Sequence, residues 1–132
     1  MIGVDTNVLV RLLVRDNPAQ LDAAARFMAQ RSADDPAFVS SVVVAEFAWV
    51  LDKSYGYASE AIHGAMDWLF DSENIVVERS DLIENAVLVA REANADISDA
   101  IIAALAEDAG ASKTATFDRN AAKRLPGMEL LA

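Results

Sequence analysis

Four acidic residues stand where a carboxylate could serve chemistry. Asp5 and Asp118 each follow a short β-compatible stretch and precede a helical one. Because the carboxyl ends of parallel strands meet at one edge of a sheet, we expect both side chains at that edge, where open α/β sheets bind ligands. Glu46 interrupts an otherwise apolar stretch, where burial is costly without a partner or a metal. Asp99 falls in the first turn of an almost entirely apolar helical segment.

The chemistry that four neighbouring carboxylates would support is cation binding. Carboxylates placed close together repel each other, and this repulsion raises their pKa values unless a cation lies among them. The chain has no cysteine and one histidine, so the ligands would be oxygens, which suit Mg²⁺ or Mn²⁺. Such an ion can activate water and stabilise the leaving oxygen in phosphodiester hydrolysis. His63 is expected in mid-helix, exposed and away from these acids, so the sequence does not predict a Ser/His/Asp triad.

Each acid also has a purely structural interpretation. Asp96 and Asp99 fit helix caps favoured by the helix dipole. Asp118 fits the N-cap of a last helix, Asp5 a turn, and Glu46 a solvated helix face. Any one of these interpretations is plausible alone, but all of them holding together, with no functional role, is much less so.

Composition and charge restrict the class of protein. The 132 residues are 54% hydrophobic and 24% charged, which predicts one folded domain over residues 1–132 and excludes disorder. We expect neither a signal peptide nor a membrane span, and the absence of cysteine fits a reducing cytoplasm. The formal net charge of −10 argues against a general nucleic-acid binder, unless some of the acids surround a cation.

Short strand patterns alternate with helical ones along the whole chain, which predicts βαβ units and a mainly parallel sheet with helices on both faces. Thr6 and Asn7 can cap the first helix, and Asp81 with Glu84 fits a capping box for a later one, in which Ser80 is the alternative cap. The β-branched run Val42–Val44 could also form a strand, but the apolar spacing favours a helix. The expected strands are 2–4, 38–39, 75–77, 114–117 and 128–131, and the expected helices are 8–13, a segment after 18, 42–51, 59–70, 82–90, 99–108 and 119–125.

Four segments in order resemble the motifs of PIN-domain ribonucleases, and more specifically the VapC toxins of type II toxin–antitoxin modules. They are Asp5-Thr6-Asn7-Val8-Leu9, Val44-Ala45-Glu46-Phe47, the stretch 96–104 (DISDAIIAA) and Thr116-Phe117-Asp118-Arg119. The resemblance spans essentially the whole chain. It implies an α/β fold of the PIN type, a three-layer sandwich with a central, mainly parallel sheet flanked by helices. It also implies endonucleolytic RNA cleavage with Mg²⁺ or Mn²⁺, a homodimer and a cognate VapB-type antitoxin.

The resemblance implies a role for each matching residue. The positions of Asp5, Glu46, Asp99 and Asp118 match the acidic quartet, and all four would be catalytic and metal-binding. Asp96 is an additional acid near them. Supporting hydrogen bonds would come from Thr6, Asn7 and Thr116.

The RNA would need a basic surface. Our candidates for contacts with its phosphates are Arg11, Arg15, Arg119, Lys123 and Arg124. Trp49 and Trp68 could stack on bases, but their apolar neighbours favour the core or a dimer interface.

Three other functions compete with the nuclease. A PIN-like module could dock RNA or a partner without catalysis, although the complete acidic set argues against it. A receiver domain would need a phosphorylatable Asp at the end of the central strand and a Lys at a later strand end, but the third strand ends at Glu78 and no lysine follows Met128. A haloacid dehalogenase-type phosphatase would need an Asp at the position of Asn7.

Overall fold

Three parallel strands begin the fold. The structure, a computed structural model, describes residues 1–132. Strand β1 (Ile2–Gly3) pairs with β2 (Ala37–Val39), and β2 pairs with β3 (Ile75–Val77), so β2 is the central strand. The register sets Ile2 opposite Ala37, and Ala37 opposite Ile75. Ala37 and Val39, which point to the same face of β2, have no exposed surface, and Phe38 on the other face is partly buried.

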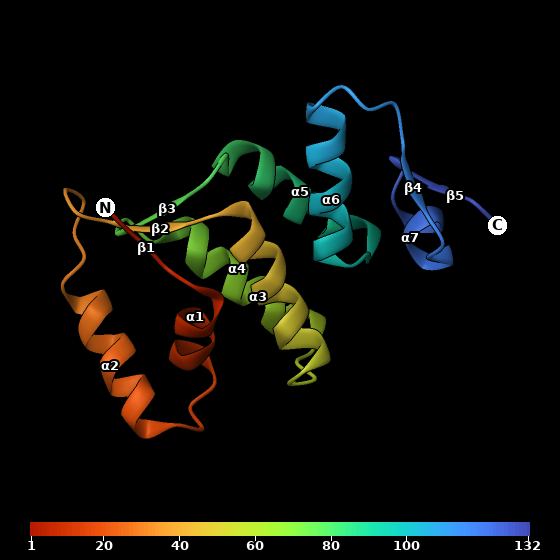
Figure 1. The fold of residues 1–132 in the computed structure, drawn as a ribbon. Helices are drawn as coiled ribbons and strands as arrows, with labels where there is room; N and C mark the ends of the chain where they lie inside the picture. The colour runs from red at the N-terminus through yellow and green to blue at the C-terminus, as the bar shows by residue number, and fades with distance from the viewer. The chain divides into compact units, whose positions relative to one another are not determined.

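Four helices connect and follow these strands: α1 (Thr6–Leu13), α2 (Pro18–Ala29), α3 (Ser41–Lys53) and α4 (Ser59–Asp71). Helix α1 packs against α2 and α3, and α4 packs against α3 and β3 (Figure 1). The strands and these helices form one compact unit, Met1–Glu78, which we call the N-terminal unit. The Asn17 side chain caps α2 and Pro18 takes its first position, so a helix does begin where the sequence places one.

The fully buried side chains of the N-terminal unit come from α1, β2, α3 and α4. Phe47, Leu51, Met66 and Leu69 are fully buried. The valine run at the start of α3 is helical, so the favoured prediction is confirmed and the strand alternative is wrong. Apolar residues recur along α3 at intervals of three and four, and this period buries them together only in a helix.

The C-terminal unit, Arg79–Ala132, has its own elements. Helices α5 (Ser80–Ala93) and α6 (Ile97–Asp108) pack against each other as a hairpin. Strand β4 (Thr114–Thr116) pairs in parallel with β5 (Met128–Leu130), and α7 (Arg119–Arg124) connects the two and packs on both. Asn94 ends α5 in the left-handed region, at a φ of 52°, and so turns the chain toward α6.

Two predicted caps are wrong. Helix α1 is capped by Asp5, and Thr6 and Asn7 lie inside the helix. Helix α5 begins after Arg79, which adopts a φ of 49° and makes no side-chain capping bond, so neither Ser80 nor Asp81 caps it. A side-chain cap requires an extended backbone at the residue before the helix, and Arg79 is in the left-handed region instead. Arginine has no preference for that region, so the sequence does not indicate this conformation.

The burial of one histidine and two tryptophans also differs from expectation. His63 is buried, with 4% of its surface exposed, because it lies on the inward side of α4 between Ile62 and Met66. Trp49 and Trp68 are 49% and 41% exposed, so the core alternative is wrong for both, while the dimer-interface alternative stays a prediction. Apolar neighbours in sequence therefore did not establish which face of α3 or α4 is buried.

The alternation of helices with parallel strands confirms the predicted α/β class. The prediction of a single domain stays a prediction, since the structure describes two units. No helix combines the length and the apolar character needed to cross a membrane.

Candidate active site

Asp5 stands at the carboxyl edge of the three-stranded sheet. The Val4 amide extends the β1–β2 ladder by donating to the Phe38 carbonyl oxygen at 2.9 Å, and Asp5 follows directly. Its Oδ1 accepts a hydrogen bond of 2.7 Å from the Thr6 amide at the start of α1. The side chain is exposed to solvent. Asp5 therefore combines a capping role with an accessible carboxylate at the edge where α/β sheets bind ligands.

Glu46 lies in the second turn of α3, a helix that starts at the same edge of the sheet. The Ser40 side chain caps that helix by accepting from the Val43 amide at 3.2 Å. Glu46 is exposed, and it shares its helix face with Val42 and Trp49. The cost of burying a charge therefore does not explain this residue, and the solvated face considered from sequence is what the structure shows.

Glu78 is a third carboxylate at this edge, and the sequence pattern did not predict its role. Its Oε1 accepts from the Ser41 amide at 2.9 Å and from the Ser41 hydroxyl at 2.8 Å. Its amide donates to the Val39 carbonyl oxygen at 2.9 Å. Glu78 thus fixes the first turn of α3 to the end of β3. The available signal was its place at the end of the third strand, but a partner 37 residues away could not be read from the sequence.

Thr6 and Asn7, two of the predicted supporting residues, follow Asp5 directly and differ in burial. Thr6 is 5% exposed, and its hydroxyl oxygen is buried without a hydrogen-bond partner. It contacts the Asp5 carboxylate through its backbone amide. Asn7 is exposed on the first turn of α1. The supporting hydrogen bonds predicted for these two side chains stay predictions.

The C-terminal unit holds the other acids. Asp96 caps α6, and its Oδ1 accepts from the Asp99 amide at 3.1 Å. Asp99 lies in the first turn of α6 and is partly exposed. The capping bond therefore ties the backbone of Asp99 to the Asp96 side chain, so the predicted auxiliary acid contacts a predicted catalytic one.

Asp118 stands between β4 and α7. Its Oδ1 accepts from the Ala121 amide at 3.0 Å, and its own amide donates to the Thr116 hydroxyl oxygen at 3.0 Å. The side chain is exposed. Thr116 thus supports the turn through the backbone of Asp118, while Asp118 caps the helix, as its structural interpretation anticipated.

The donor set suits a hard divalent cation. All the candidate ligands are carboxylate oxygens, the ligand type that Mg²⁺ and Mn²⁺ prefer. In Asp5, Asp96 and Asp118 the capping bond uses Oδ1, which leaves the second oxygen of each carboxylate for another contact. Within neither unit do three or more acidic or histidine side chains gather as a metal-binding group. The N-terminal unit supplies Asp5 and Glu46, and the C-terminal unit supplies Asp99 and Asp118.

The predicted RNA-contact residues divide into engaged and open side chains. Arg11 pairs with Asp16 and also donates to the Tyr55 hydroxyl at 3.3 Å. Arg124 donates to the Asn94 carbonyl oxygen at 2.6 Å, which connects α7 to the turn between α5 and α6. Arg124 is exposed as well as engaged, whereas Arg15, Arg119 and Lys123 are exposed and form no side-chain hydrogen bond or ion pair.

Comparison with protein families identifies the class. The PIN domain family matches residues 2–127, and the chain belongs to this family. With the helices and parallel strands described above, this match confirms the predicted PIN-like α/β fold class. PIN domains are generally nucleases that depend on divalent metal ions, so the family supports a nuclease. No curated protein matches the chain significantly.

Proposed function

We propose that the protein is a Mg²⁺- or Mn²⁺-dependent endoribonuclease and the toxin of a VapBC-type toxin–antitoxin module. The observation that carries the proposal is the PIN family match over residues 2–127, which includes every one of the predicted acids. The carboxylates stand where strands end or helices begin, and they offer oxygen ligands only.

Asp5, Glu46, Asp99 and Asp118 are the proposed metal-binding and catalytic residues. A bound divalent ion would supply an activated water and a stabilised leaving oxygen at the phosphodiester. The chain's own contribution is to hold the carboxylates in place. Helix starts fix Asp5 and Asp118 through their capping bonds, and Asp96 fixes the first turn that bears Asp99. Asp96 is therefore a positioning residue in this proposal.

The toxin role rests on the four acidic motifs, which resemble those of VapC toxins and all lie within the matched residues 2–127. We further propose a cytoplasmic homodimer neutralised by a VapB-type antitoxin. The exposed Trp49 and Trp68 are available to such a dimer interface.

The test is cleavage of a panel of structured cellular RNAs by the purified protein with Mg²⁺ or Mn²⁺, repeated with EDTA. We expect cuts at a defined site that disappear when the metal is chelated. The Asp99→Asn variant should lose cleavage while the protein keeps its fold, because the replacement removes a charge and changes little in volume.

Asp81→Asn is the matched control. Asp81 occupies the first turn of α5 as Asp99 occupies the first turn of α6, so both variants lose the same favourable interaction with a helix dipole. Only the Asp99 variant should lose activity. Full activity in Asp99→Asn would refute the proposed site. Binding of RNA without any cutting would favour the catalytically silent docking module.

The toxin role has a separate test in a bacterial host. Induced expression of the wild type should arrest growth, and the Asp99→Asn variant should not. If the wild type cleaves RNA in vitro while the host grows normally at the same level of soluble protein, the nuclease stands and the toxin role is wrong.

A further inference from the structure

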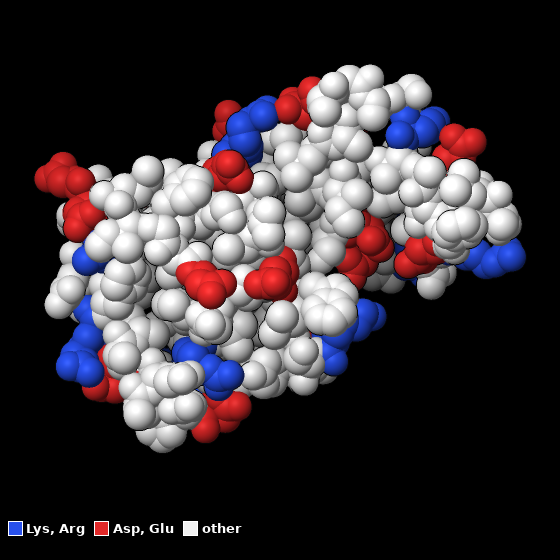
Figure 2. All heavy atoms as spheres, viewed as in Figure 1, with Lys and Arg blue, Asp and Glu red and all other residues white.

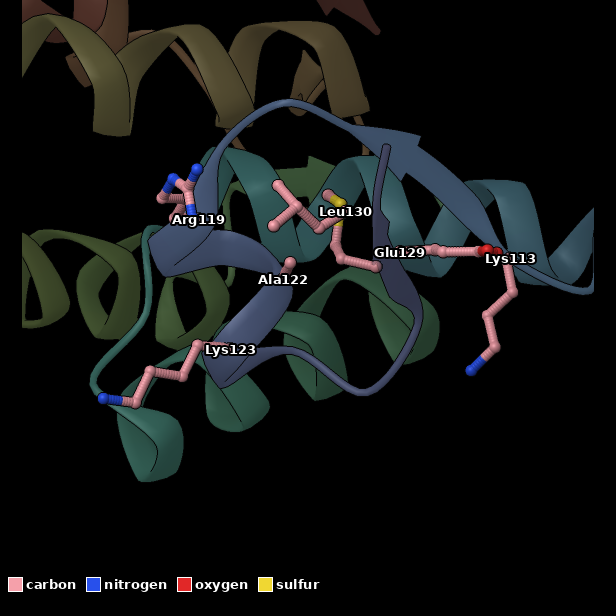
Figure 3. A pocket seen from close by; sticks show the side chains of 7 residues that line it. Lys113, Arg119, Ala122, Lys123, Glu129 and Leu130 are labelled. Carbon is pink, nitrogen blue, oxygen red and sulfur yellow. The ribbon is translucent and has the colours of Figure 1, made fainter. Parts of the chain in front are cut away.

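A groove with basic side chains at its rim lies in the C-terminal unit. It has a volume of about 530 Å³ and runs along α7 and β5. Figure 3 shows Arg119 and Lys123 on the α7 side and Lys113 beyond β5, with Ala122 and Leu130 between them. The groove therefore has cationic groups on both sides of an apolar floor.

The charge of this segment is opposite to that of the whole chain. Residues 113–124 contain four basic residues and one acid, in a chain whose net charge is −10. In Figure 2, blue side chains lie at the edges of the part of the C-terminal unit that holds α7 and β5, with red ones beside them and white surface between. An isolated basic segment in an acidic protein creates a local attraction for anions.

The rim cations are not neutralised by acids of their own unit. Within the C-terminal unit, Arg119 and Lys123 form no ion pair, and Lys113 donates to the Pro126 carbonyl oxygen at 3.1 Å. Basic residues elsewhere in the chain do pair with aspartates: Arg11, Arg26, Arg31, Lys53 and Arg79. The groove therefore holds positive charge that is available to a ligand.

The floor indicates what kind of anion fits. Ala122, Met128 and Leu130 line the groove between the cations. Proteins that bind single-stranded nucleic acid combine cations along the phosphate backbone with apolar or aromatic surface under the bases or sugars. An acidic peptide would use the cations but would gain little from the apolar floor.

We propose that this groove binds a single-stranded segment of the RNA substrate, with phosphates on Lys113, Arg119 and Lys123 and a base or ribose over Ala122 and Leu130. The inference rests on the proposed nuclease function and extends it to the recognition of the substrate. Arg119 follows Asp118 directly, so a strand held in the groove starts next to a proposed catalytic acid. Glu129 also lines the groove and opposes phosphate binding there.

The experiment measures binding of fluorescently labelled oligouridylate in EDTA, which prevents metal-dependent cleavage. The double variant Lys113→Ala/Lys123→Ala should bind about tenfold more weakly than the wild type. The slope of log affinity against log salt should become shallower by about 0.7 for each phosphate of the single strand that the variant no longer neutralises. Glu129→Gln should bind more tightly, a gain that damage to the fold cannot produce.

The matched control is Arg26→Ala/Lys53→Ala. It changes the net charge by the same amount at two exposed sites of the N-terminal unit, each paired with an aspartate. We expect its affinity and salt slope to stay close to those of the wild type. Equal weakening in both double variants would show a general charge effect and overturn the groove. The absence of oligouridylate binding by the wild type would overturn it too.

Two further arms separate this inference from the proposed function and from another ligand. If the wild type cleaves RNA and the Lys113→Ala/Lys123→Ala variant keeps the same KM and RNA affinity, the proposal that the groove binds RNA is wrong. The proposed ribonuclease activity is then unaffected. If the groove variants change RNA binding as expected but no RNA is cut with Mg²⁺ or Mn²⁺, the nuclease is wrong and the groove stands. Displacement of the oligouridylate by polyglutamate at equal concentration would assign the groove to an acidic protein partner and overturn the RNA assignment.

Discussion

Two replacements at Asp118 should separate its capping role from its proposed catalytic role. The carboxylate caps α7 by accepting from the Ala121 amide, and it also belongs to the proposed metal-binding set. Asparagine caps a helix about as well as aspartate but carries no charge, whereas alanine can do neither. Asp118→Asn should therefore lose cleavage and keep its stability, and Asp118→Ala should lose both.

The size of each effect follows from the structure. Loss of an N-cap bond to alanine costs about 1 kcal/mol of unfolding free energy, a factor of about five in the folded-to-unfolded ratio. With a urea dependence of about 2 kcal/mol per molar, the midpoint of unfolding should move by about 0.5 M. Cleavage should fall by at least about a hundredfold in both variants, since even a residue that only orients a metal ligand costs about 10- to 100-fold.

The assays are urea unfolding followed by circular dichroism and cleavage of the RNA found with the wild type. Ser40→Ala is the matched control, because it removes another N-cap bond, to the Val43 amide, at a residue outside the proposed acidic set. It should lose about the same stability as Asp118→Ala and keep its activity. If Asp118→Asn unfolds as easily as the alanine variant, the capping argument fails. If it cleaves like the wild type, the carboxylate charge is not needed.

Three further predictions concern stability and pH. The hydrogen bond from Arg79 holds the pKa of Asp108 below its usual value of 3.8. The hydrogen bond from the Met1 amine lowers the pKa of Asp35 in the same way. Because both carboxylates take up a proton more readily in the unfolded chain, the free energy of unfolding should decline as pH falls below about 4. Asp108→Asn should flatten that decline in urea midpoints measured against pH, and an unchanged profile would contradict it. Phe47→Ala should cost about 3–5 kcal/mol in urea unfolding, because the ring is fully buried. Trp49→Ala, on the exposed face of the same helix, should cost much less, and equal losses would refute the burial pattern.

The secondary structure was predictable because its signals are local. The strand that the sequence places at 75–77 is β3 in the structure, and the helix expected over 59–70 ends one residue later. Asn17 and Ser40 cap helices as small polar side chains before apolar periodic segments commonly do. Each of these features depends on neighbours within about one helical turn.

Burial was less predictable, since it depends on which face of an element the rest of the fold covers. His63 was expected to be exposed, yet it lies inside, while Trp49 lies half exposed outside. The helix period gives the relative placement of residues around α3 and α4 but not the direction of the core when both faces carry apolar residues. The left-handed backbone conformation of Arg79 was equally unpredictable, because arginine has no preference for that conformation.

The candidate site was predictable as a set of residue types and not as a set of contacts. The carboxylates at strand ends could be recognised one by one. The bonds of Glu78 to Ser41 and of Arg11 to Asp16 and Tyr55 could not, and they change the roles of those residues. Lys113 was not predicted at all, because its relation to Arg119 and Lys123 arises only when β5 returns beside β4.

The capping bonds themselves bear on whether the acids are functional. Capping requires a side-chain oxygen and not a negative charge, and this chain uses Asn17 and Ser40 for that purpose in two helices. At Asp5, Asp96 and Asp118 it uses carboxylates instead, each with one oxygen outside the cap. Helix dipoles favour a negative charge at such positions, but that interaction contributes less than about 1 kcal/mol at an exposed site. An asparagine at each of the three positions should therefore leave the fold nearly unchanged, so any activity lost with the charge reports on function.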